Sequence, residues 1–164
     1  MTTQEMKSYP ALAQAITICE AGLNLPSSIG LIGEAIAVEL FGASAKSGKS
    51  IDCILPDGSN VQVKTLRQAA SKGESEFFGN LKDYTMALVL FIQLHADFSF
   101  RRFAMLSSSE AERLILTQSP TYRYPPDGSG GYKRHLGGYM QLKTLTANQL
   151  WSTTLPAKTK GRQQ

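Results

Sequence analysis

Four polar side chains between residues 33 and 64 have the types and the order expected of a divalent-metal site. They are two carboxylates, one amide and one amine, contributed by Glu34, Asp52, Gln62 and Lys64. Mg²⁺ prefers oxygen ligands and keeps several waters, so one or two carboxylates suffice to hold it beside a phosphate. A metal ion held in this way polarises a phosphoryl group and lowers the pKa of a bound water. These residues therefore predict the hydrolysis of a phosphodiester bond.

A predicted β-hairpin explains how three of these side chains meet. Residues 51–55 and 61–66 have the composition of strands, and the Pro-Asp-Gly sequence between them is a strong turn signal. Side chains alternate across a strand, so Gln62 and Lys64 share one face and Asp52 lies on that face of the neighbouring strand. The backbone carbonyl of Val63 offers a further oxygen ligand. We expect Lys64 to orient or deprotonate the attacking water and to stabilise charge at the phosphorus.

The elements around the hairpin predict a mixed α/β fold. Apolar residues at helical spacing predict one helix from Pro10 to Gly22 and a second, carrying Glu34, from Ser27 or Ser28 to Gly42. Residues 43–50 and 67–73 are expected to be loops, and residues 74–84 a helix. Further strands are expected at 86–94, 100–106 and 139–145, with a helix beginning at Ser109 and an irregular segment at 119–138. The order predicts a central sheet flanked by helices.

The same region resembles a known superfamily, the restriction-endonuclease-like PD-(D/E)XK nucleases. The resemblance covers roughly residues 27–108 and rests on Gly33-Glu34-Ala35, Ile51-Asp52, the Asp57-Gly58 turn and Val61-Gln62-Val63-Lys64-Thr65. It implies an αβββαβ core with a mixed central sheet and Mg²⁺ or Mn²⁺ as cofactor. It also implies that Asp52 and Gln62 bind the metal, that Lys64 is the catalytic lysine, and that Glu34 is the additional acid. The chain departs from the pattern because Ile51 replaces the proline and Gln62 replaces the second acid.

Two functions follow from these residues. The first is a divalent-metal-dependent endonuclease that cuts DNA, of the restriction, repair or junction-resolving type. The second is a catalytically silent nucleic-acid-binding module that keeps the nuclease fold, and the neutral Gln62 favours it. A plainer alternative is that Asp52, Gln62 and Lys64 form the solvent face of an amphipathic hairpin, as polar strand residues usually do.

The charge distribution suits a partner with a phosphate backbone. Residues 1–60 carry three Lys/Arg and six Asp/Glu, whereas residues 61–164 carry fourteen Lys/Arg and seven Asp/Glu. An acidic cluster able to hold a cation, followed by a basic remainder, predicts binding to nucleic acid. Arg101 and Arg102 are adjacent in a predicted strand, so at most one of them faces the site. The candidate contacts to the nucleic acid are Lys46, Lys49, Arg67, Lys72, Lys133 and Arg134.

Other sequence features narrow the alternatives. Residues 43–50 resemble a phosphate-binding loop, but they follow a helix and precede a strand, which is the reverse of the arrangement that binds ATP or GTP. The chain is expected to form a single domain over residues 1–155, comprising the core and an elaboration at 109–155, followed by a disordered tail at 156–164. With no signal peptide, no membrane span and two thiols in apolar patterns, we expect a cytoplasmic protein. Many nucleases of this kind pair to cut two strands, so the resemblance allows a homodimer.

Overall fold

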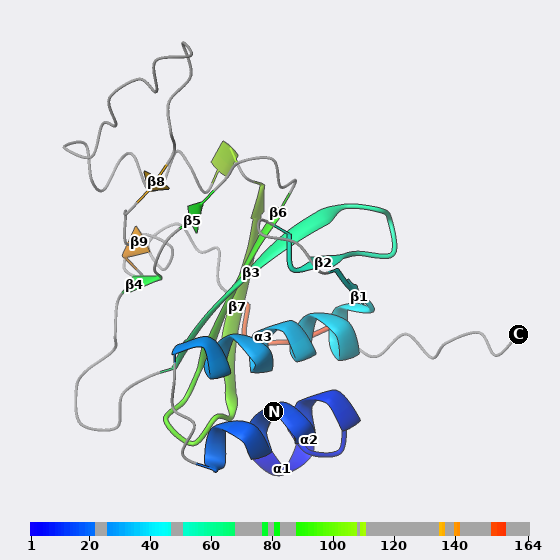
Figure 1. Ribbon diagram of the computed structural model, residues 1–164, viewed down its shortest axis with the longest axis vertical. Helices are drawn as coiled ribbons and strands as arrows, with labels where there is room; N and C mark the ends of the chain where they lie inside the picture. The colour runs from blue at the N-terminus through cyan, green and yellow to red at the C-terminus, as the bar shows by residue number, and fades with distance from the viewer. Residues whose placement is uncertain are drawn as a thin grey trace, which may run out of the picture.

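A five-stranded mixed sheet and three helices make up the core of the fold (Figure 1). The computed structural model describes residues 1–21, 26–46, 51–67, 77–78, 81–82, 88–107, 109–110, 135–136, 140–141 and 152–156. The mixed α/β class predicted from the sequence is confirmed. Among the described residues, no helix is long and apolar enough to cross a membrane.

The helices form where the apolar spacing predicts them. Helix α2 (Pro10–Glu20) begins with proline at its first turn, where the missing N–H costs no hydrogen bond, and it buries Leu12 and Ile16. Helix α3 (Pro26–Phe41) ends at Gly42, whose φ of 68° is a left-handed conformation that favours glycine. The short helix α1 (Thr3–Met6) was not predicted, and a capping box between Thr2 and Glu5 begins it.

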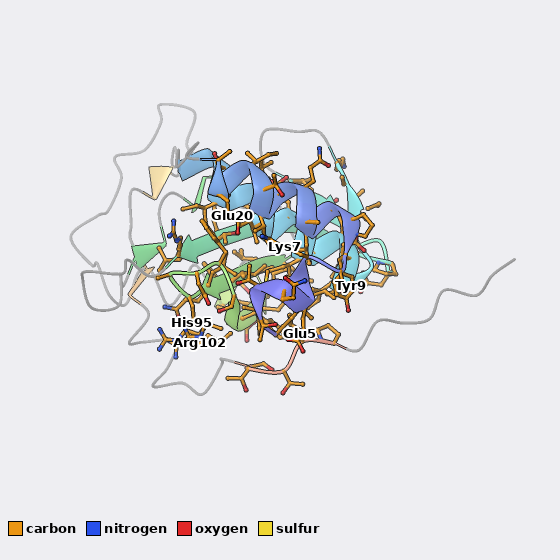
Figure 2. All side chains as sticks on the ribbon, turned by 90° about the horizontal axis from the view of Figure 1, so that it is seen from below. Glu5, Lys7, Tyr9, Glu20, His95 and Arg102 are labelled. Carbon is orange, nitrogen blue, oxygen red and sulfur yellow. The ribbon has the colours of Figure 1, made fainter. Side chains whose placement is uncertain are left out.

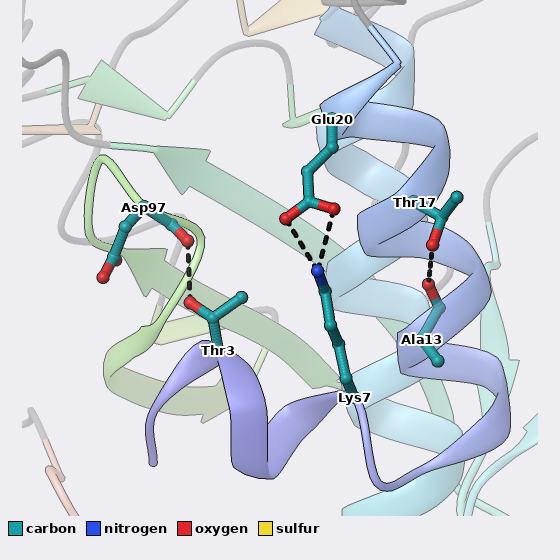
Figure 3. Close-up of polar contacts among 6 residues, drawn as sticks. All are labelled: Thr3, Lys7, Ala13, Thr17, Glu20 and Asp97. Carbon is teal, nitrogen blue, oxygen red and sulfur yellow. Dashed lines mark hydrogen bonds and ion pairs between the residues drawn. The ribbon is translucent and has the colours of Figure 1, made fainter.

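Polar contacts attach the N-terminal helices to the rest of the fold. Lys7 Nζ lies 2.8 Å from Glu20 Oε2 and joins the end of α1 to the end of α2 (Figures 2 and 3). Thr3 Oγ1 donates to the backbone carbonyl of Asp97 at 2.7 Å, which ties α1 to the turn after strand β6 (Figure 3). Through these contacts, α1 is attached both to α2 and to the turn at one end of the sheet.

The sheet has the strand order β1-β2-β3-β6-β7. Its members are β1 (Ser44–Ala45), β2 (Cys53–Ile54), β3 (Asn60–Arg67), β6 (Leu88–Leu94) and β7 (Phe100–Ser107). Neighbouring strands are antiparallel except for β3 and β6, which run parallel. The predicted hairpin is therefore confirmed, with Gly58 at φ 87° in its turn. Strand β1 falls inside the segment predicted to be a loop.

Strand β6 lies between β3 and β7 inside the sheet and is buried on both of its faces. Five residues from Val89 to Gln93 are each at most 1% exposed. A parallel partner on one side and a nearly continuous apolar sequence are typical of such a strand. The strand predicted at residues 86–94, buried on both faces, is confirmed for the described residues 88–94.

The two faces of β3 pack against different parts of the protein. Val61 and Val63 belong to the hydrophobic core that includes Ile32 and Ile36 of α3, which lies across the sheet in Figure 1. Gln62 and Lys64 alternate with these valines and therefore occupy the second face. Gln62 is only 5% exposed. The interpretation of this hairpin face as an ordinary solvent surface is therefore wrong for Gln62.

The helix predicted at residues 74–84 is wrong where the structure describes that segment. Phe77–Phe78 form strand β4 and Leu81–Lys82 form strand β5. They pair with β9 (Met140–Gln141) and β8 (His135–Leu136), respectively. Pairing with segments more than fifty residues away overrides the local helical pattern, as tertiary context commonly does. The second helix of the expected αβββαβ core is thus not found at these residues.

Four other predicted segments are described only in part. Ser109 and Glu110 are helical, as expected for the start of a helix, and β9 lies within the strand predicted at 139–145. The irregular segment at 119–138 and the tail at 156–164 fall almost entirely outside the described residues. Leu155 packs against the hydrophobic core, and Pro156 follows it.

Candidate metal centre

Asp52 is held at the edge of β3 by two hydrogen bonds. Its backbone N–H donates to the carbonyl of Val61 at 3.0 Å, and its Oδ2 accepts the backbone N–H of Val63 at 2.7 Å. The side chain thus acts as the acceptor that a strand carbonyl would otherwise supply. Val61 and Val63 lie on either side of Gln62 in the chain. The two hydrogen bonds therefore fix Asp52 beside residue 62 of β3.

The same arrangement places the carbonyl of Val63 at the site. In an extended strand, the N–H and C=O of one residue point toward the same neighbouring strand. Since the N–H of Val63 points to Asp52, its carbonyl oxygen points toward the same edge. The predicted oxygen ligand of Val63 and the predicted carboxylate ligand of Asp52 are therefore brought together.

Gln62 has a buried side-chain oxygen with no hydrogen-bond partner. The residue is 5% exposed, and its Oε1 accepts no hydrogen bond from the part of the chain that the structure describes. Leaving a buried acceptor unsatisfied costs on the order of 1–3 kcal/mol, so such atoms are rare in folded proteins. A cation bound next to Asp52 would satisfy this oxygen, which is the role that the sequence predicted for Gln62.

Glu34 of α3 approaches the same end of the site from the helix layer. The Glu34 side chain is exposed, but partial burial of its carboxyl group raises the pKa of that group. The charge of Asp52 raises the pKa further. The buried thiol of Cys53 is affected in the same way. Its burial, followed by the charges of Asp52 and Glu34, raises its pKa to about 11. Glu34 is therefore close enough to Asp52 for the charge of that residue to raise the pKa of Glu34.

Lys64 lies two residues beyond Gln62 on the same strand and the same face. Successive residues on one face of a strand are separated by about 7 Å, within reach of a lysine side chain. The residue is half-buried and lies opposite Phe91 in the parallel register with β6. This position is where the sequence placed the catalytic amine.

The predicted basic contacts have different surroundings. Lys46 is exposed, and its backbone N–H donates to the carbonyl of Asp52 at 3.1 Å, so this lysine flanks the site. Arg67 donates from Nε to the carbonyl of Ala96 at 2.8 Å, and its guanidinium lies 4.0 Å from the ring centre of Phe98. Arg67 therefore supports the β6–β7 turn. Lys49, Lys72, Lys133 and Arg134 lie outside the described residues.

A polar pair on the second face of the sheet was not predicted from the sequence. Arg102 Nε donates to Gln93 Oε1 at 2.6 Å, while Gln93 Nε2 has no hydrogen-bond partner. Gln93 is fully buried. A lone glutamine within an otherwise apolar strand was the available signal, because a polar side chain in such a strand must find a partner. Arg102, rather than Arg101, is therefore the arginine on this face.

A surface cavity of about 360 Å³ lies away from this site. It is formed between Tyr9, Leu40, Phe100 and the segment around Leu155. Because its lining contains none of the predicted site residues, the cavity is separate from the candidate metal centre.

The ligand set at the site combines charged and neutral oxygens. Among the described residues, no group of three or more His, Cys, Asp or Glu side chains could hold a metal ion. The two carboxylates of Glu34 and Asp52 would therefore have to act with neutral oxygens from Gln62 and Val63. A comparison with known protein families found no family model that matches the chain, and a comparison with curated proteins found no match.

Proposed function

We propose that this protein is a divalent-metal-dependent endonuclease that hydrolyses phosphodiester bonds in DNA. The observation that carries the proposal is the unsatisfied Oε1 of Gln62, buried on β3 at the position beside the Asp52 carboxylate. A buried acceptor without a donor is a poor arrangement by itself, and a cation held near Asp52 would resolve it.

The available donors fit Mg²⁺ or Mn²⁺. All four are oxygens, and two of them carry negative charge, as hard divalent cations require. Asp52 and the Val63 carbonyl would hold the ion at the edge of β3 that faces β2. Gln62 on one face of this strand and Glu34 of α3 on the other face would complete the set. The raised pKa of Glu34 also fits, because a bound cation would offset the repulsion from Asp52.

The chemistry divides between the metal and the protein. When bound, the metal supplies a polarised phosphoryl group and a more acidic water. Asp52 keeps its orientation through the hydrogen bond from Val63, so its second oxygen is aimed without loss of side-chain freedom during the reaction. Lys64 orients the attacking water and stabilises the charge that develops on the phosphate oxygens.

Strand order and charge support the same function. Helix α3 is followed by β1, β2 and β3 as an antiparallel meander, and β6 then joins β3 in parallel. This order fits the αβββ start of the αβββαβ core that the resemblance implies. Lys46 beside the site and the basic excess after residue 60 favour a polyanionic substrate.

A nucleic-acid-binding module without catalysis is the second candidate, and Gln62 favours it. Replacing a carboxylate by an amide removes one negative charge from the site, which weakens attraction for a divalent cation. The second candidate predicts binding of DNA that does not depend on metal and no cleavage under any condition.

Cleavage assays separate the two candidates. Supercoiled plasmid, linear duplex, single strands and a four-way junction would be incubated with Mg²⁺, Mn²⁺ or EDTA. The wild type would be compared with Lys64→Ala, Asp52→Asn and the control Lys7→Ala, whose lysine pairs with Glu20 far from the site. We expect metal-dependent cutting that is lost in the first two variants and kept in the control. Binding of DNA without cutting of any substrate would instead establish the second candidate.

A further inference from the structure

Helix α3 makes an unusually close approach to β3 at Gly33. A Cβ atom placed on Gly33 would overlap Oγ1 of Thr65 and would come within 3.0 Å of Val63 Cγ1. The helix can take this position only because residue 33 has no side chain. Gly30, one turn earlier on the same helix, has nothing within 4 Å of its equivalent Cβ position. The close contact is therefore a local feature of Gly33 rather than a property of the whole helix.

The hydroxyl of Thr65 lies at this contact. Among the described residues, it has no hydrogen-bond partner. Its Oγ1 is buried and unsatisfied in the structure. A polar atom pressed against a glycine backbone gains only weak Cα–H contacts, which are worth less than an ordinary hydrogen bond. Stability alone is thus a poor reason for this pairing, because an apolar side chain at residue 65 would avoid the unsatisfied hydroxyl.

The position of Gly33 in the chain connects the contact to the candidate site. Glu34 is the next residue on α3, and Val63, which donates to Asp52, is two residues before Thr65 on β3. A methyl group at residue 33 would overlap Thr65 Oγ1, and we expect the helix to withdraw because the χ1 angle of a β-branched side chain is stiff. Glu34 would move away from Asp52 together with the helix.

We propose that Gly33 is a positioning residue for the candidate metal centre. Its contact with Thr65 seats α3 on β3 and so holds the carboxylate of Glu34 beside Asp52. The inference rests on the proposed metal-dependent function, although its first measurement is made without metal. Gly33 touches neither substrate nor metal, and it acts through Glu34.

The first measurement follows Glu34 in the metal-free protein. Glutamate labelled with ¹³C at the carboxyl carbon would give a Glu34 signal, assigned with Glu34→Gln, that moves when Asp52→Asn removes the neighbouring charge. We expect this displacement to fall to less than half in Gly33→Ala. It should return in Gly33→Ala combined with Thr65→Ala, in which the overlapping hydroxyl is gone, and should be unchanged in the matched control Gly30→Ala.

The second measurement is the affinity for Mn²⁺ alone, by calorimetry or electron paramagnetic resonance. Residues that orient metal ligands typically contribute about tenfold or more to metal affinity, so Gly33→Ala should bind Mn²⁺ at least about tenfold more weakly. The double variant should recover to within about threefold of wild type. If Gly33→Ala does not fold, Thr65→Ala and the shape-conserving Thr65→Val carry the test, with weaker Mn²⁺ binding expected only for Thr65→Ala.

The outcomes distinguish this proposal from the proposed function. Normal displacement of the Glu34 signal in Gly33→Ala, with a lowered melting temperature, would overturn the proposal and leave Gly33 a packing residue. Normal Mn²⁺ affinity in that variant would overturn it as well. A wild type that binds no Mn²⁺ would refute the proposed metal-dependent function, and the metal-free signal would still decide whether Gly33 positions Glu34.

Discussion

The carboxylate of Asp52 completes the backbone hydrogen bonding of Val63. Its Oδ2 accepts the Val63 N–H at 2.7 Å, in the place where a carbonyl of the neighbouring strand would normally lie. One oxygen of this carboxylate therefore stabilises the strand pairing, and the other is available to the candidate metal centre. The same side chain stabilises the β2–β3 pairing and contributes charge to the candidate metal centre.

Two substitutions of Asp52 separate these roles. Asp52→Ala leaves the Val63 N–H without its partner and should lower the free energy of unfolding by about 1–3 kcal/mol. Asp52→Asn keeps an acceptor of the same shape and should cost less than half as much. Both variants should lose the stabilisation that Mg²⁺ confers on the wild type. Urea unfolding with and without Mg²⁺ measures both effects, and equal losses of stability in the two variants would contradict the assignment.

Substitutions of Gln62 should change the stability of the metal-free protein and the metal affinity in opposite directions. Gln62→Leu removes the unsatisfied buried oxygen and should stabilise the metal-free protein by about 1 kcal/mol while abolishing cleavage. Gln62→Glu adds a third carboxylate, so it should bind Mn²⁺ about tenfold more tightly and be less stable without metal. Calorimetric titration with Mn²⁺ and thermal unfolding test both expectations. Weaker Mn²⁺ binding by Gln62→Glu would show that residue 62 does not face the ion.

The stability of the metal-free protein should depend on pH through Glu34. Its pKa in the folded protein is raised above the ordinary value of 4.5, so the folded state binds this proton more tightly than the unfolded state. The resulting penalty is absent below about pH 4.5 and grows as the pH rises through the folded pKa. Glu34→Gln should therefore be more stable than wild type at neutral pH, by less than about 1 kcal/mol because solvent screens the group. The difference should vanish at about pH 4, and added Mg²⁺ should reverse it at neutral pH. Unfolding curves at the two pH values check this, and a difference independent of pH would contradict it.

Arg67 and Lys46 should differ in their effect on DNA binding. Arg67→Lys loses the Nε bond to Ala96 and the planar stacking on Phe98, and should cost about 1–2 kcal/mol of stability. Because that guanidinium supports a turn, we expect little change in the salt dependence of binding. Lys46→Ala removes an exposed cation beside Asp52 and should lower the slope of log affinity against log salt by about one. Fluorescence anisotropy over a range of salt concentrations measures both slopes. A reduced slope for Arg67→Lys would restore its predicted role as a phosphate contact.

Short-range patterns in the sequence were sufficient for much of the fold. Helices α2 and α3 follow the apolar spacing that ends at a glycine, and the β2–β3 hairpin follows from its turn residues. Strand β6 is apparent from its apolar composition. In each case the residues that determine the element are near one another in the chain, so local energetics decide the outcome.

Segments that depend on distant partners were predicted wrongly. The helix expected at 74–84 contains β4 and β5, whose partners follow residue 134. No local pattern could reveal these pairings, because the hydrogen bonds that favour them come from elsewhere in the chain.

The candidate site shows the same division. The residue types alone identify the candidate oxygens and the candidate amine at positions 34, 52, 62 and 64. Local rules also predict that residues 52, 62 and 64 come together, because the hairpin and the alternation of side chains along a strand depend on neighbouring residues. The burial of the Gln62 oxygen, the hydrogen bond from Val63 to Asp52, and the effect of the Asp52 charge on the pKa of Glu34 all depend on the folded chain. The reason is physical: these properties depend on how closely α3 packs on β3, and that distance is set at Gly33 by the shape of the assembled core.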